Sequence, residues 1–214
     1  MSAATREVVV VDLGMGNLRS VARALERAGA SARISSDADV IANAPRLVVP
    51  GQGQFRDCAT ALEGELGGAV RAFVASGRPY LGICLGMQAL FASSEEAPGM
   101  AGLGIFDGTV KRFARDLRDA GGERLKVPHM GWAELALPAS PHPLLRSEPR
   151  WFYFVHSYVC VPDDAGIIAA TADHGGAFCA AVARENVFAC QFHPEKSGAA
   201  GHALLTRYLE GAWS

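Results

Sequence analysis

The chain has 214 residues, of which 50% are hydrophobic and 20% charged, enough to bury the core of one domain. Its net charge of -2 argues against a protein that binds nucleic acids or anionic membranes electrostatically. The apolar runs fall far short of the roughly 20 residues that cross a bilayer, and Met1–Arg6 carries no signal-peptide pattern. Five cysteines without C-x-x-C spacing favour a reducing, cytoplasmic setting over disulfides or a zinc site.

The first ninety residues alternate short apolar runs with helical stripes. Val8–Asp12 is rich in valine, as buried strands are, and Asn17–Ala28 repeats apolar residues with the helical period up to Gly29. The remaining segments predict strands at Ala32–Ser35, Leu47–Val49 and Tyr80–Ile83 and helices at Phe55–Leu66, Ala69–Ser76 and Leu85–Phe91. This alternation predicts an α/β fold with a mostly parallel sheet and helices on both faces.

The second half consists mainly of strand-like runs separated by Pro, Gly and Asp turns. These runs are Gly108–Phe113, Val127–Trp132, Arg150–Val155, Ile167–Thr171, Ala177–Ala183 and Val187–Gln191. A helix is predicted over Gly198–Leu209, after the last strand, and the sequence shows no repeat and no linker long enough to divide the chain. We therefore predict a single domain over residues 1–214, with its core at about 8–209, in which antiparallel strands are added to the parallel sheet.

One short stretch predicts a nucleophile. Gly82-Ile83-Cys84-Leu85-Gly86 lies between a strand and a helical segment and has the form of the G-x-S-x-G nucleophile elbow, with cysteine replacing serine. Such a turn strains its central residue, its glycines leave room for neighbouring backbone, and the following helix N-terminus favours a thiolate. The other cysteines lack such a frame and are interpreted as buried structural residues: Cys58, Cys160, Cys179 and Cys190.

A cysteine nucleophile needs a base and a group that orients the base. His193 follows the strand-like run Val187–Gln191, and Glu195 stands two residues later. Residues two apart in an extended segment point to one face, so the carboxylate can hold the imidazole with its other nitrogen toward the thiol. The tripeptide H-P-E alone is common in loops, but together with the elbow it predicts a Cys84–His193–Glu195 triad.

Five collinear stretches carry a resemblance to known enzymes. Pro79–Gln88 and Gln191–Glu195 resemble the class I, or triad, glutamine amidotransferases. Three more look like the glutaminase subunits of imidazole glycerol phosphate synthases: Gly14–Ser20, Val127–Trp132 and Phe152–Tyr158. The resemblance runs from about Val8 to Tyr208. It implies the flavodoxin-like fold of class I amidotransferases and an enzyme of histidine biosynthesis without a cofactor or metal.

The resemblance also implies a mechanism. Cys84 attacks the side-chain amide of glutamine, His193 protonates the departing ammonia, and water then hydrolyses the thioester with His193 as base. The implied oxyanion hole consists of backbone N–H groups of Gly51, Gln52 and Leu85. The implied contacts to glutamine are Gln88, Glu96, His156, Ser157 and Tyr158. Without the resemblance, Gln88 is equally compatible with a solvent-facing helix residue and Glu96 with an ordinary loop charge.

Ammonia released into neutral water becomes ammonium, which is no nucleophile, so an acceptor site must lie close by. The chain shows no G-x-x-x-x-G-K-[ST] phosphate loop, so we expect the acceptor on another protein. By resemblance this partner is the (β/α)8-barrel cyclase subunit of a heterodimer, which makes imidazole glycerol phosphate and a carboxamide ribotide. The residues implied to face it are Asn17, His129, Met130, Trp132 and Lys196, although Trp132 fits a core position equally well.

Two positions depart from the family pattern. Leu13 stands where tyrosine is usual, and Ala133 where asparagine is usual. Neither belongs to the triad, so these departures put in question details of the partner-facing surface and not the reaction.

Two other interpretations stay open. One is a different triad amidotransferase, serving pyridoxal phosphate, anthranilate or guanylate synthesis; the stretches Val127–Trp132 and Phe152–Tyr158 and the lack of a synthetase domain argue against it. The other is a catalytically silent binding or regulatory subunit with an amidotransferase-like fold, which the intact triad disfavours.

Overall fold

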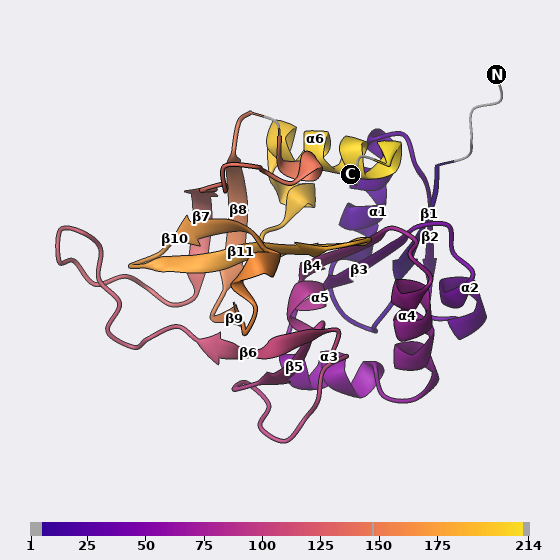
Figure 1. The fold of residues 1–214 in the computed structure, drawn as a ribbon, viewed down its shortest axis with the longest axis horizontal. Coiled ribbons are helices and arrows are strands. Elements are labelled where there is room, and N and C mark those ends of the chain that lie inside the picture. Colours follow the sequence, from indigo (N-terminus) through magenta and orange to yellow (C-terminus); the bar gives the residue numbers. More distant parts are fainter. Residues whose placement is uncertain (1–5, 147, 212–214) are drawn as a thin grey trace.

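This computed structural model describes residues 6–146 and 148–211. Within them, the protein is built around one large central sheet. Its parallel half contains β1 (Glu7–Val11), β2 (Ser31–Ser35), β3 (Leu47–Gly51), β4 (Tyr80–Cys84) and β12 (Val187–Cys190). The spatial order of these strands is β2-β1-β3-β4-β12 (Figure 1). Because neighbours in this half run parallel, the carboxyl ends of β3, β4 and β12 meet at one edge of the sheet.

Antiparallel strands extend the sheet beyond β12. They are β11 (Ala177–Arg184), β10 (Ile168–Asp173), β9 (Tyr158–Pro162) and β6 (Phe106–Arg112), and β6 pairs in parallel with β5 (Phe91–Ser94). A separate antiparallel pair, β7 (His129–Glu134) and β8 (Trp151–His156), lies at the end of the molecule away from β1 and β2 (Figure 1).

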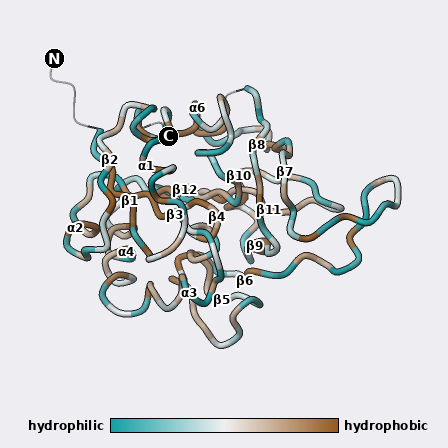
Figure 2. The backbone as a smooth tube through the Cα atoms, turned by 180° about the vertical axis from the view of Figure 1, so that it is seen from behind, coloured by the Kyte–Doolittle hydropathy of each residue, from teal (hydrophilic) through white to brown (hydrophobic). Residues whose placement is uncertain are grey.

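Helices cover both faces of the parallel half. On one face α1 (Leu18–Arg27) and α6 (Gly198–Glu210) pack with Val8 and Val10. The other face carries α2 (Ala38–Ala42), α3 (Phe55–Ala61) and α4 (Glu65–Ala75), which pack with Val9 and Val11. Side chains of a strand alternate between the two faces of the sheet, so the valine run of β1 contributes to the hydrophobic core on each face. Figure 2 shows the central strands as hydrophobic. Within the described ranges, no helix combines the length and apolarity needed to cross a bilayer.

The predicted α/β class, with a mostly parallel sheet and added antiparallel strands, is confirmed. Several element limits were wrong. The helix expected over Leu85–Phe91 is a single turn, α5 (Leu85–Gln88), because Phe91 begins β5 and pairs with Phe106. The break between α3 and α4 falls at Gly64, whose φ is 72°, and not between Leu66 and Ala69. The sequence patterns missed α2, β5 and β9 altogether.

Candidate active site

Cys84 occupies the turn from β4 into α5, with φ 55° and ψ -108°. A positive φ at a residue other than glycine is strained. The flanking glycines leave no space for side chains: a Cβ on Gly86 would lie 1.8 Å from the Val49 carbonyl oxygen, and one on Gly82 would lie 2.8 Å from the Gly86 carbonyl oxygen. The turn therefore has the geometry of a nucleophile elbow.

His193 and Glu195 lie next to this turn, just beyond the end of β12. His193 Nδ1 is 2.8 Å from Glu195 Oε1, and both side chains are 1% exposed. The other ring nitrogen, Nε2, is buried without a hydrogen bond of its own. Burial lowers the pKa of His193, but interactions with the Cys84 sulfur and the Glu195 carboxylate raise it, with a net pKa of about 9. At neutral pH the imidazole thus holds a proton that it can donate to a leaving group.

The remaining cysteines are buried. Burial raises the pKa of Cys58 and Cys179 to about 12, and it raises the pKa of Cys160 and Cys190 well above the usual value. Thiols of this kind are poor nucleophiles because the thiolate is the reactive form.

Backbone from a second strand lies beside the nucleophile. β3 ends at Gly51, which pairs with Cys84 in the strand register, and a Cβ on Gly51 would lie 2.7 Å from Leu85 Cβ. Leu85 is the first residue of α5, so its N–H has no acceptor within the helix. Gln52 and Leu85 line the same cavity as Cys84, whereas Gly51 is not among its lining residues and pairs with Cys84 in the sheet; the oxyanion hole that the resemblance implies at these three residues stays a prediction.

Cys84 and His193 line a cavity of about 400 Å³, a volume typical of small-molecule sites. All five residues expected to contact glutamine lie on its wall: Gln88, Glu96, His156, Ser157 and Tyr158. Lys196 and Gln52 line it as well. The structure therefore brings together residues that lie more than a hundred positions apart in the sequence.

Comparison with known proteins identifies the family. The family described as glutamine amidotransferase class-I matches residues 9–210. A curated relative from Syntrophotalea carbinolica, "Imidazole glycerol phosphate synthase subunit HisH", is 50% identical over 206 residues, covering 94% of this chain and 98% of the relative. The protein of the same name from Methylococcus capsulatus is 51% identical over 207 residues, covering 94% and 95%. The chain belongs to the class-I glutamine amidotransferases and, within them, to the HisH family.

Solved structures of amidotransferases share the fold. One described as "Crystal structure of glutamine amidotransferase" has a TM-score of 0.70 and 23% identity, covering 95% of this chain and 98% of its own. PurLQS from Thermotoga maritima has a TM-score of 0.70 and 18% identity, covering 96% and 97%. At such identities the likeness concerns the fold alone.

In this amidotransferase, two expected glutamine contacts already have partners inside the protein. Glu96 Oε2 accepts a hydrogen bond from the Phe55 N–H at 2.9 Å, at the start of α3. Gln88 is 4% exposed, and its Nε2 donates to Gln191 Oε1 at 3.0 Å. Both residues line the cavity, and their hydrogen bonds also connect the segments that form its wall.

The residues expected to face a partner divide into two groups. Met130 and Trp132 are 63% and 52% exposed, and Lys196 and Asn17 are exposed as well, the latter also accepting a hydrogen bond from the Ser20 N–H at the start of α1. His129, in contrast, is 6% exposed. Neighbouring residues of a strand point to opposite faces, so His129 and Met130 of β7 cannot both face outward, and the surface position predicted for His129 is wrong.

The two departures from the family pattern are also buried. Leu13 is 4% exposed and packs in the core under α2 and α3, while Ala133 is 9% exposed and packs in the core of the opposite face. Both side chains are therefore part of the interior, and they could change a partner-facing surface only indirectly, through the packing beneath it.

Gln191 is a site residue to which the sequence patterns gave no role. It is fully buried, and its Nε2 lies 3.5 Å from the Cys84 sulfur. The extended segment expected for these residues is wrong: β12 ends at Cys190, and Glu195 lies in a 3-10 turn over Pro194–Lys196 that begins after His193. The two-residue strand period therefore could not have predicted the position of Gln191.

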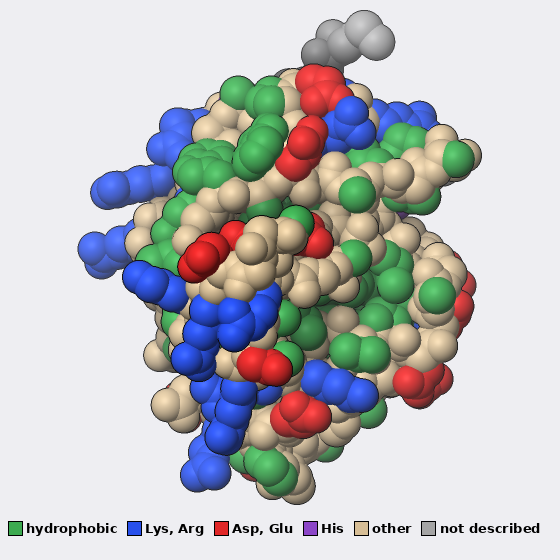
Figure 3. All heavy atoms as spheres, turned by 90° about the vertical axis from the view of Figure 1, so that its left-hand side faces the viewer, with side chains coloured by type: hydrophobic (Ala, Val, Ile, Leu, Met, Phe, Trp, Pro, Cys, Tyr) green, Lys and Arg blue, Asp and Glu red, His purple; other side chains and the backbone are tan. Residues whose placement is uncertain are grey.

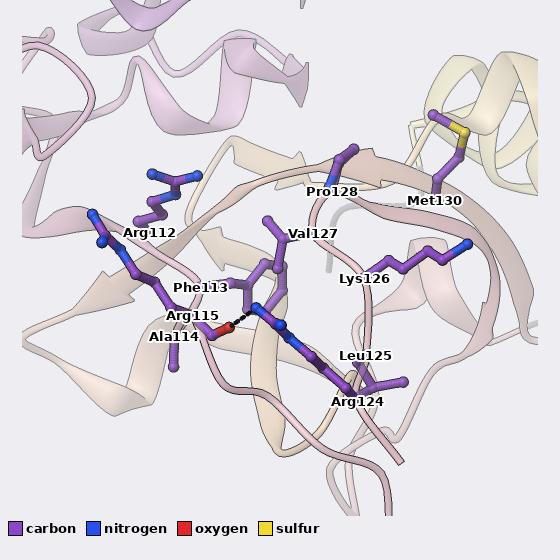
Figure 4. Close-up of a pocket in the computed structure, with 10 residues that line it drawn as sticks. All are labelled: Arg112, Phe113, Ala114, Arg115, Arg124, Leu125, Lys126, Val127, Pro128 and Met130. Atoms are coloured by element: carbon purple, nitrogen blue, oxygen red, sulfur yellow. Dashed lines mark hydrogen bonds between the residues drawn. The ribbon is translucent and has the colours of Figure 1, made fainter.

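A larger cavity, of about 800 Å³, lies between the end of β6 and the start of β7 (Figure 4). Phe113 and Val127 contribute apolar lining, and its cations are Arg112, Arg115, Arg124 and Lys126. Figure 3 shows Lys and Arg side chains gathered at this end of the molecule. The residues drawn in Figure 4 include no cysteine, histidine or carboxylate, so this cavity lacks the chemistry that surrounds Cys84.

Proposed function

We propose that the chain is the glutaminase subunit of an imidazole glycerol phosphate synthase, acting in histidine biosynthesis. It hydrolyses glutamine to glutamate and ammonia, and the ammonia passes to a cyclase subunit bound as a heterodimer. One arrangement carries the catalytic part of this proposal: Cys84 on a strained turn and the His193–Glu195 pair share one cavity of about 400 Å³. The name of the HisH relatives supports the assignment to this synthase.

The first half-reaction forms a thioester. The Cys84 sulfur attacks the side-chain carbonyl carbon of glutamine, and the carbonyl oxygen becomes an oxyanion. N–H groups of Gly51, Gln52 and Leu85 stabilise that charge. The C–N bond then breaks while His193 gives its proton to the nitrogen, which leaves as ammonia.

The second half-reaction releases glutamate. His193, now neutral, removes a proton from water, and the resulting hydroxide attacks the thioester carbon. The C–S bond breaks, the sulfur leaves as thiolate, and His193 is again protonated. Glu195 holds Nδ1 throughout and so keeps Nε2 directed at the reacting atoms.

The delivery of ammonia requires a partner surface. Trp132 and Met130 are large apolar side chains exposed on the same face of β7, and an exposed apolar cluster is typical of an interaction site. Lys196 lines the cavity and lies with its Nζ 5.9 Å from the centre of the Tyr153 ring. We assign these residues, with Asn17, to the side that receives the cyclase.

Glutamate release and product synthesis, measured with and without the candidate cyclase, test the proposal. Cys84→Ala is expected to abolish glutamine-dependent synthesis and to leave ammonia-dependent synthesis largely intact. Cys179→Ala, which changes a buried cysteine outside the cavity, serves as the matched control and is expected to keep both activities. Loss of both activities in Cys84→Ala alone would contradict the separation of the two reactions between two chains.

A further inference from the structure

Gln191 contacts both the nucleophile and Gln88, a residue that lines the cavity. Its side chain is fully buried, Nε2 lies 3.5 Å from Cys84 Sγ, and Oε1 accepts from Gln88 Nε2 at 3.0 Å. Its backbone N–H donates to the Ala180 carbonyl at 2.8 Å, which ties it to β11. The reaction scheme of nucleophile, base and orienting carboxylate does not use this side chain.

The direction of the bond to sulfur follows from the neighbouring groups. The Tyr158 carbonyl can only accept, and it lies 3.4 Å from Gln88 Nε2. Gln88 therefore turns its NH₂ group toward Tyr158 and Gln191, so the Gln191 atom that faces Gln88 must be the acceptor Oε1. The NH₂ group of Gln191 is thereby left facing Cys84.

The Tyr158 carbonyl is itself held from the other side. It also accepts from His156 Nδ1 at 2.8 Å, and His156 Nε2 lies 3.1 Å from His129 Nδ1. Burial lowers the pKa of His156 to about 3 and that of His129 to about 4, so both rings are neutral at physiological pH. A continuous set of hydrogen bonds therefore fixes the amide of Gln191 from β7 through β9 to the nucleophile.

A buried N–H donor that faces sulfur is well satisfied only when the sulfur is charged. A neutral thiol is a weak acceptor, whereas a hydrogen bond to a thiolate is assisted by its charge. An unsatisfied buried donor is costly, so the Gln191 N–H group gains most from this contact at the steps in which the sulfur carries negative charge. His193 also interacts with this sulfur, and that interaction raises the pKa of its imidazole, so Gln191 is a second N–H donor beside the base.

We propose that Gln191 is a positioning residue whose Nε2–H group holds the Cys84 sulfur directed into the cavity and hydrogen-bonds the thiolate when the C–S bond breaks. The role in turnover rests on the proposed function, but the effect on the sulfur does not. Gln191 itself forms no covalent bond and transfers no proton.

The test compares Gln191→Leu, which keeps the approximate volume but removes the donor, with the wild-type chain. The rate of Cys84 alkylation by iodoacetamide at pH 7, followed by mass spectrometry, is expected to fall about 10- to 100-fold, as for the loss of a hydrogen bond to a charged group. In the heterodimer kcat is expected to fall by a similar factor with KM little changed. Tyr208→Phe, which removes buried hydrogen bonds to the Leu47 and Pro79 carbonyls, is the control and should leave the alkylation rate unchanged.

Alkylation of Gln191→Leu at the wild-type rate would overturn the proposal. If Gln191→Leu fails to fold, Gln191→Glu replaces it, because the carboxylate keeps an acceptor for Gln88 but turns an oxygen without a proton toward the sulfur. This variant should slow alkylation at least as much as Gln191→Leu. Alkylation of Gln191→Glu at the wild-type rate would also overturn the proposal. A wild-type heterodimer that releases no glutamate would refute the proposed function, while the alkylation result on the isolated chain would still decide the role of Gln191.

Discussion

The protonation state of His193 is set by two neighbours that act against burial. Burial lowers the pKa of the imidazole, whereas Cys84 and Glu195 raise it from 6.5 to about 9. Because the folded-state pKa lies above the ordinary value, the proton and its stabilising interactions are present below about pH 6.5 and are lost as the pH rises through about 9. The acid that protonates the departing amide nitrogen is therefore present at neutral pH and is lost at alkaline pH.

Glu195→Gln removes one of the groups that raise this pKa. The alkaline limb of the pH profile for glutamate release by the heterodimer should therefore move to lower pH than in the wild type. The variant should be about two orders of magnitude less damaging than His193→Asn, which removes both base and proton donor. A Glu195→Gln profile that superimposes on the wild-type profile would mean that another group orients the imidazole.

At the scale of elements, the turn between β4 and α5 depends on backbone contacts that exclude side chains. Gly86 lies against the Val49 carbonyl of β3, and Gly51 lies against Leu85. These close contacts allow the start of α5 to pack against the ends of β3 and β4, which places the Leu85 N–H beside Cys84. Glycine is needed here for space, since Gly86 itself has no positive φ.

Gly86→Ala should destabilise the fold by about 1–3 kcal/mol, because a Cβ 1.8 Å from the Val49 oxygen forces the backbone to move. Gly68→Ala is the matched control. Gly68 lies in α4 with nothing within 4 Å of an added Cβ, so alanine should stabilise it by about 0.5–1 kcal/mol. Urea unfolding midpoints measure both changes; equal midpoints for the two variants would contradict the packing argument.

Sequence patterns predicted the elements whose hydrophobic periodicity or turn residues lie within the element itself. The valine run of β1 and the capped stripe of α1 appeared at nearly the right limits, and the elbow glycines marked the turn. The sequence could not predict β5, because Phe91 becomes a strand residue only by pairing with Phe106. Likewise, His129 is buried because its ring stacks on His174, with ring centres 4.2 Å apart, and Gln191 acquires its role from Cys84, 107 positions away.

At the scale of the whole molecule, the β7–β8 pair has one buried and one exposed face. Directly paired residues share a face, so Met130 lies with Val155, Trp132 with Tyr153, and Glu134 with Trp151. Met130, Trp132 and Trp151 are 63%, 52% and 48% exposed. The opposite face carries His129, whose ring packs beside those of Phe154 and Phe178.

Trp132→Ala should weaken cyclase binding about 10- to 100-fold, the range expected of a central aromatic residue in an interface. The stability of the isolated chain should change little, because half of the side chain is already exposed. Ile34→Ala is the control: Ile34 is 39% exposed on β2, the strand at the far edge of the sheet. Calorimetric titration gives both dissociation constants, and equal values for the two variants would remove Trp132 from the interface.

The last prediction concerns how the partner switches the glutaminase on. Gly51 and Gly53 flank Gln52, and Gly53 has φ 120° with open space around it, so the Gly51–Gln52 peptide can rotate at little steric cost. A Cβ on Gly16 would lie 3.3 Å from the Gln52 nitrogen, so the loop that carries Asn17 to the expected partner side also packs against this peptide. Partner binding can therefore favour one orientation of the oxyanion donor over the other.

Loss of one oxyanion donor typically costs about 10²–10³ in rate. We therefore expect the isolated chain to be nearly silent, with glutamate release rising by at least about 10²-fold when the cyclase and its ligand bind. Steady-state assays of the purified chain, alone and in the heterodimer, measure this directly. The alternative is a tight turn after β3 with a permanently formed oxyanion hole, and full activity of the chain alone would decide for that alternative.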